Sequence, residues 1–223
     1  MWLTARDQDG RPLHATDPRG VDDENNSDPP WPCRRNQAGA IPRPYRTPLT
    51  ELGRAQAKAV AVRIAKAWNT AKVYTSPMGR CVATGQQIAK ACRIASEPLE
   101  ALNDLDYGQW QWRTYDEVRA EWPDLLAAWH AMPHSVRFPK GDSLQDLVAR
   151  TANALRFVLE RHASETEIVV FVGHDSVNRA LLLQLLDQSL SAYWLIAQAP
   201  CAINEIDIID GRICVQRMNE THL

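Results

Sequence analysis

Three side chains with complementary chemistry stand at positions where an α/β sheet could bring them together. His174 follows an apolar run at residues 168–172, and Arg80 follows a Thr-Ser-Pro break after a shorter apolar segment. A guanidinium and an imidazole at neighbouring helix N-termini suit a phosphoryl group, because charge-assisted hydrogen bonds and the helix dipole both favour an anion. Asp104 lies in a loop between them in sequence, and a carboxylic acid there could protonate a leaving alkoxide.

The apolar run IVVFV at residues 168–172 predicts a core strand. Four of its five residues are β-branched and no polar residue alternates with them, which indicates a strand buried on both faces, as in a parallel sheet. Asp175 or Ser176 can then cap a helix whose apolar positions are Val177, Ala180, Leu181 and Leu185. His174 is thereby delivered to the carboxyl end of a core strand, where open α/β sheets place their ligand sites.

The rest of the chain from Thr47 supplies the elements of an α/β layer architecture. Thr50 is expected to cap the first helix, and Asp142 or Ser143 the long amphipathic one. An Asp210-Gly211 turn predicts a closing hairpin. The expected elements are helices at 51–68, 78–92, 115–122, 125–132, 143–162 and after 175, and strands at 71–75, 93–98, 168–172, 202–209 and 213–218.

Residues 1–46 differ from the remainder in composition. They hold seven of the fourteen prolines and an acidic-polar run, DDENNSD, and only the first five residues could form a short strand. Too little apolar surface is present to offset the entropy of ordering this segment, so we expect it to be mostly irregular or disordered. A single domain is expected at 47–223, with a small insert at about 110–140 that contains four tryptophans between 110 and 129.

Overall composition excludes several classes of protein. A net charge of −2 argues against a nucleic-acid-binding or membrane-surface protein. The apolar runs are too short to span a membrane, and no signal peptide is expected at the N-terminus. Five scattered cysteines without metal-ligand spacing indicate free thiols in the cytoplasm.

Five segments in this order resemble the histidine phosphatase superfamily, also called phosphoglycerate mutase-like. They are TPLTELGRAQA, TSPMGRCVATGQQIA, LNDLDYGQW, FPKGDSLQDLVAR and VVFVGHDSVNRALLLQLL. The resemblance implies a three-layer sandwich around a mostly parallel sheet. It also implies hydrolysis or transfer of phosphate on a small phosphorylated metabolite through a phosphohistidine, without a metal or other cofactor. By resemblance, Arg80 and His174 bind phosphate, His174 is also catalytic, and Asp104 occupies the position of the proton donor.

The family's nucleophile is missing. Its R-H-G motif ends the first core strand, and this sequence contains no R-H-G. The nearest match is MWLTARD at residues 1–7, where Arg6 would hold the family's phosphate-binding arginine position and Asp7 would replace the histidine. Two explanations remain open: residues 1–46 are not the natural N-terminus, or the chain is a pseudoenzyme. Either way, we expect an inactive or impaired phosphatase, because the two-step route needs a covalent nucleophile.

The sequence departs from the family pattern in smaller ways, and some of its segments fit other functions. Trp112 stands where glycine is usual, and Lys140 replaces a small residue before Gly141. Asp175 competes with Asp104 as proton donor but is better explained as a helix cap. The segment GHDSV resembles the nucleophile turn of α/β-hydrolases, yet Val177 fills a position that needs a small residue. A non-catalytic phosphate binder and a mutase-type phosphotransferase are the remaining alternatives, and the substrate and oligomeric state stay open.

Overall fold

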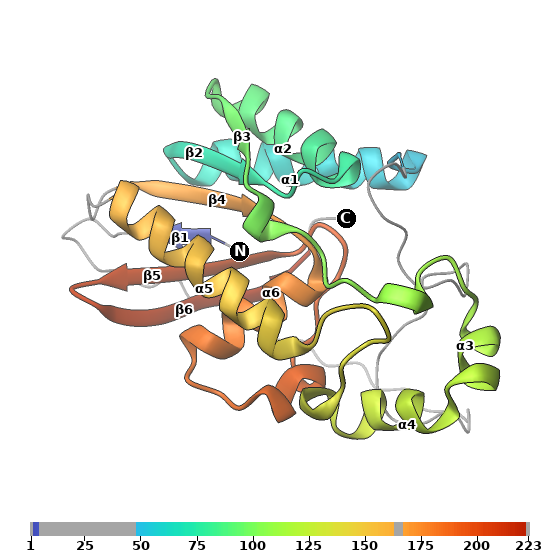
Figure 1. Ribbon diagram of the computed structural model, residues 1–223. Helices are drawn as coiled ribbons and strands as arrows, with labels where there is room; N and C mark the ends of the chain where they lie inside the picture. Colours follow the sequence, from blue (N-terminus) through green and yellow to red (C-terminus); the bar gives the residue numbers. More distant parts are fainter. Residues whose placement is uncertain (1, 5–47, 163–166, 222–223) are drawn as a thin grey trace, which may run out of the picture.

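The computed structural model describes residues 2–4, 48–162 and 167–221, which form one sheet covered by helices (Figure 1). The sheet has the strand order β3-β2-β4-β1-β5-β6. Its strands are β1 (Trp2–Thr4), β2 (Thr70–Thr75), β3 (Ser96–Pro98), β4 (Ile168–Val172), β5 (Ile203–Ile209) and β6 (Arg212–Glu220). The α-helices are α1 (Glu51–Ala67), α2 (Gly79–Cys92), α3 (Tyr115–Glu121), α4 (Pro123–Ala131), α5 (Leu144–Arg161) and α6 (Asp175–Leu185).

Alternating side chains of the central strands face two separate helical layers. Val73 and Val170 pack in a cluster with residues of α1 and α2. Tyr74, Val169 and Phe171 pack in a second cluster with residues of α5, α6 and the insert. The β2–β3, β2–β4 and β1–β5 pairs are parallel, whereas β1–β4 and β5–β6 are antiparallel. The predicted three-layer sandwich around a mostly parallel sheet is confirmed.

Strand β1 fills the central position of the sheet but is only three residues long. Trp2 pairs with Val170 and Leu3 with Val169, so β1 runs antiparallel to β4. The carboxyl end of β1 therefore lies beside the amino end of β4. The first strand is reduced as expected, and it ends on the side of the sheet opposite to the carboxyl ends of β2 and β4.

Most of the predicted element boundaries lie within a few residues of those observed. Thr50 caps α1 through a bond from the Gly53 N–H, and Ser143 caps α5. The hairpin turns at Asp210 and Gly211, which both have positive φ (50° and 72°), as a two-residue type I′ connection requires. The insert is built from α3, α4 and a 3₁₀ turn at Pro133–Ser135, with an aromatic core that contains Trp110, Trp129 and Phe138.

The cap predicted for α6 was wrong. The N-cap of α6 is His174, and Asp175 is already helical; the cap makes no side-chain hydrogen bond, because its imidazole is engaged elsewhere. The N-cap of α2 is Met78, which makes no side-chain cap hydrogen bond. Trp112, the residue found in place of a family glycine, has a φ of 70°, which explains why glycine is favoured there.

The N-terminus of α5 carries a reciprocal capping box. Ser143 Oγ accepts a bond from the Asp146 N–H, and the Asp146 carboxylate accepts one from the Ser143 N–H. These bonds hold the pKa of Asp146 down at about 2. We expect Ser143→Ala to lower the free energy of unfolding by about 1 kcal/mol, since an orphan helix N–H loses its partner. Urea unfolding monitored by circular dichroism checks this, and an unchanged midpoint would contradict it.

Candidate active site

The loops after β2 and β4 bring the three predicted residues into direct contact. The Ser76 N–H bonds to the Val172 carbonyl at 2.8 Å, which ties the carboxyl ends of the two strands together. Arg80 lies in the first turn of α2, and its Nη2 is 2.9 Å from both Asp104 Oδ2 and His174 Nδ1. His174 Nδ1 is itself 3.4 Å from Asp104 Oδ2. The geometry thus forms one compact arginine–carboxylate–histidine cluster at the edge predicted from the sequence.

The contacts of His174 define its protonation. A guanidinium only donates hydrogen bonds, so Nδ1 must accept the bond from Arg80. The proton is then on Nε2, which lies 3.0 Å from Ser76 Oγ. Burial, the main cause, lowers the pKa of His174 to about 4; Arg80 lowers it further, whereas Asp104 opposes the shift. His174 is therefore neutral at physiological pH.

Asp104 is buried, and both carboxylate oxygens accept hydrogen bonds. Oδ1 accepts bonds from Ser176 Oγ at 2.6 Å and from the Leu105 N–H at 3.0 Å, and Oδ2 pairs with Arg80. Only 9% of the residue is exposed. These contacts orient the carboxylate toward the guanidinium and fix the loop that carries it.

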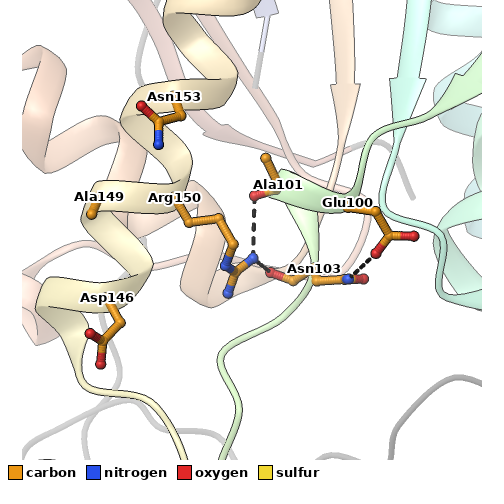
Figure 2. Close-up of a pocket in the computed structure, with 7 residues that line it drawn as sticks. All are labelled: Glu100, Ala101, Asn103, Asp146, Ala149, Arg150 and Asn153. Carbon is orange, nitrogen blue, oxygen red and sulfur yellow. Dashed lines mark hydrogen bonds between the residues drawn. The ribbon is translucent and has the colours of Figure 1, made fainter.

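A clamp from α5 holds the backbone of the same loop. Arg150 donates through Nη1 to the carbonyls of Ala101 and Asn103 (Figure 2). Its Nη2 donates to the carbonyl of Asp104 at 3.1 Å. Asn103 in turn accepts a bond from Ser76 Oγ at 3.2 Å and donates to Glu100. An open pocket of about 600 Å³ lies over this clamp, lined by Glu100, Ala101, Asn103, Asp146, Ala149, Arg150 and Asn153.

Asp175 pairs with a buried arginine on the next turn of α6. Its Oδ2 lies 3.5 Å from Arg179 Nη1, and the Arg179 guanidinium packs against the rings of Tyr193 and Trp194 at 5.2 and 4.9 Å. Arg179 also donates to the Ile196 carbonyl at 2.9 Å. The carboxylate therefore offsets a buried charge, so it serves neither as the expected helix cap nor as a partner of the His174 ring in this structure.

Sequence reasoning missed the supporting residues. Ser76 and Ser176 are fully buried and hold His174 and Asp104, and Arg150 holds the Asp104 loop. The two serines lie inside the segments TSPMGRCVATGQQIA and VVFVGHDSVNRALLLQLL, which is the only signal that could have found them. Arg150 ends the segment FPKGDSLQDLVAR, but its type and position on the amphipathic helix do not distinguish it from a surface arginine.

The remaining predictions concern Arg6, a metal site and a membrane-spanning helix. Arg6 lies outside the described residues. Among those that are described, no group of three or more His, Cys, Asp or Glu side chains could hold a metal ion. Within the same part of the chain, no helix has both the length and the apolar character needed to cross a membrane.

The lowered pKa of His174 makes stability depend on pH. Below pH 6.5 the unfolded chain binds a proton on this histidine, while the folded state excludes that proton until about pH 4. Stability is therefore lost as the pH falls through this window, by about 3 kcal/mol from this residue. Urea unfolding at several pH values should show a steeper loss for the wild type than for His174→Gln. Equal slopes for the two proteins would contradict the assignment.

Comparison with known proteins shows which family and which relatives this chain resembles. The family model of the histidine phosphatase superfamily (branch 1) matches residues 31–221. Phosphoserine phosphatase 1 of Hydrogenobacter thermophilus is 29% identical over 173 residues, which cover 78% of this chain and 81% of that protein. The 6-phosphofructo-2-kinase/fructose-2,6-bisphosphatase of Gallus gallus is 34% identical over 142 residues, 63% of this chain but only 28% of that longer protein.

A solved structure agrees with these sequence matches. The structure of Bacillus stearothermophilus YhfR superposes with a TM-score of 0.74 and 25% identity, and the match covers 80% of this chain and 88% of that one. The family match spans most of the chain, including all three residues of the cluster. The chain belongs to the histidine phosphatase superfamily, branch 1.

Proposed function

We propose that this chain binds the phosphoryl group of a small phosphorylated metabolite between Arg80 and His174, with phosphomonoester turnover absent or strongly impaired. The observation that carries the proposal is the single Arg80 Nη2 that contacts both Asp104 and His174 at 2.9 Å. A guanidinium held at the N-termini of α2 and α6 by one carboxylate is poised to exchange that partner for a phosphate dianion.

The direction of β1 supports the loss of catalysis. In the family the nucleophilic histidine follows the first core strand, and it must lie beside the carboxyl end of β4, where His174 lies. Here β1 runs antiparallel to β4, so the carboxyl end of β1 points away from His174. Arg6 lies outside the described residues and stays a prediction. No R-H-G occurs elsewhere in the sequence to replace it.

The roles in a competent version of the site follow from chemistry. A histidine would attack phosphorus, Arg80 and His174 would hold the equatorial oxygens, and Asp104 would protonate the leaving group before water releases phosphate. Asp104 suits this step because a phosphate that takes over Arg80 frees one carboxylate oxygen for a proton. The relatives named above act on phosphoserine and on a sugar bisphosphate, which supports a small phosphorylated metabolite as the ligand class. Mutase activity is the less favoured variant.

The cellular setting is part of the proposal. Among the described residues, Cys81, Cys92, Cys201 and Cys214 are free thiols. Free thiols persist in reducing compartments, which supports a cytoplasmic location. The net charge of −2 supports a partner other than nucleic acid.

The test is ligand-induced stabilisation measured beside turnover. Inorganic phosphate and vanadate should raise the melting temperature; at 100 times Kd, the ligand adds about 2.7 kcal/mol to the free energy of unfolding. A panel of phosphomonoesters should show no phosphate release above the buffer blank. Stabilisation that persists in Arg80→Met would contradict the assigned site. Robust turnover would contradict the loss of catalysis.

A further inference from the structure

The imidazole of His174 presents a lone pair, and not an N–H, to the centre of the site. Arg80 Nη2 donates to Nδ1 at 2.9 Å, and a guanidinium has no acceptor to offer a protonated Nδ1. Near Nδ1, the Asp104 Oδ2 atom lies at 3.4 Å and the Cys81 Sγ atom at 3.9 Å. The unliganded site is therefore built around the neutral ring.

The other ring nitrogen is already committed. Nε2–H points to the fully buried Ser76 Oγ at 3.0 Å, and that hydroxyl donates onward to Asn103 Oδ1 at 3.2 Å. Ser76 Oγ also accepts the Met78 N–H at 3.2 Å, so its donor and acceptor capacity is filled. The ring cannot meet a ligand by moving its proton from Nε2 to Nδ1 without stranding a buried serine, which would cost a hydrogen bond.

An oxyanion placed at Arg80 meets this lone pair. The fully deprotonated oxygens of a dianion only accept hydrogen bonds, so the contact with Nδ1 would be acceptor against acceptor. If a solvent proton binds Nδ1, an N–H bond forms and the imidazolium donates one bond to the ligand and keeps the other to Ser76. The dianion supplies the charge that stabilises the cation inside a buried site.

The charged groups that act on His174 are Asp104, in the loop after the 3₁₀ turn at Glu100–Leu102, Arg80 on α2 and Arg150 on α5. Cys81 on α2 also contacts the ring, and Asp175 is the next residue, in α6. Cys81 Sγ lies 3.6 Å from Nε2, but burial raises the pKa of its thiol to about 12, so it keeps its proton. Asp175 is paired with Arg179. His174 and Asp104 are thus the two groups placed to take up a proton when an anion arrives.

We infer that this site binds a dianionic oxyanion together with one proton, and that His174 takes up the proton on Nδ1. This inference rests on the proposed phosphate site and adds a stoichiometry to it. Because the bound complex holds one more proton than its separated components, the affinity for the anion should fall about tenfold for each unit of rising pH around neutrality.

Sulfate is the probe, since it stays a dianion throughout the neutral range and contributes no proton of its own. Titration calorimetry of the full chain at pH 7 in buffers of different ionisation enthalpy should show uptake of about one proton per sulfate bound. Nitrogen-15 shifts of the imidazole should show a proton on Nε2 alone without ligand, and protons on both nitrogens at saturation. Asp104→Asn should keep the uptake, and His174→Gln should lose it.

The possible outcomes distinguish a failure of this inference from a failure of the proposed phosphate-binding function. Sulfate binding without proton uptake, or uptake that survives in His174→Gln, overturns the inference and leaves the anion site in place. Loss of uptake in Asp104→Asn with its retention in His174→Gln assigns the proton to the carboxylate and overturns the inference too. Failure of sulfate, phosphate and vanadate alike to bind overturns both proposals.

Discussion

A chimera in which residues 1–46 are replaced by a family N-terminal segment, a strand that ends in R-H-G, should gain phosphomonoesterase activity. The remaining parts of the pocket are already assembled, because Arg80, Asp104 and His174 lie in mutual contact. The central position between β4 and β5 is occupied by only three residues of β1. A parallel strand there would end at the edge of the sheet that holds His174.

The expected gain is large. Enzymes accelerate such reactions by at least about 10⁶-fold, and a misplaced group costs about 10²-fold, so even an imperfect chimera should exceed the parent chain by about 10³-fold or more. Phosphate release from a phosphomonoester panel measures the rate, and acid-labile phosphate on the new histidine identifies the intermediate.

Two controls make the result interpretable. Changing the introduced histidine to alanine, or adding His174→Ala, should return the chimera to the rate of the parent. A folded chimera that binds phosphate but stays inactive would show that the cluster is not arranged for catalysis. Activity in the parent chain at the level of the chimera would instead mean that residues 1–46 already supply a nucleophile.

The cluster was predictable because strand-end positions are encoded locally. An apolar β-branched run followed by Gly173-His174, and a Ser-Pro break followed by Arg80, each place one side chain at the carboxyl end of a strand, and parallel strands bring such ends together. The position of Asp104 was harder to predict, since a loop has no hydrophobic periodicity that fixes where its side chains lie. Its place depends on Arg150, whose contacts with three loop carbonyls link residues that are 46 to 49 positions apart.

What could not be predicted depends on competition among side chains and between strand directions. The cap of α6 was misassigned because Asp175 is a good cap by type, yet Arg179 needs a carboxylate next to its buried charge. Three residues of β1 do not determine the direction of the strand, because its pairing with β4 and β5 decides that direction. A segment that short carries almost no register information of its own.

Removal of the Arg80 charge should strongly weaken oxyanion binding. Arg80→Met is expected to weaken the binding of phosphate, vanadate and sulfate by about 100-fold or more, since truncating one partner of a buried charge pair costs several kcal/mol. The same change leaves the buried Asp104 carboxylate facing the site without its cation, so the remaining pocket repels an anion. Calorimetry with each anion measures the loss.

The unpaired carboxylate also threatens the fold, and this must be separated from binding. Arg80→Met combined with Asp104→Asn removes both charges and should recover stability without recovering affinity. Arg119→Met is the matched control, because Arg119 is exposed on α3 and pairs only on the surface with Asp116 at 3.0 Å; such pairs contribute little. If the double variant bound anions as tightly as the wild type, then the affinity lost in Arg80→Met would come only from the uncompensated Asp104 carboxylate. The guanidinium would not be the phosphate ligand, and the site would have to be moved to the N-terminus of α6.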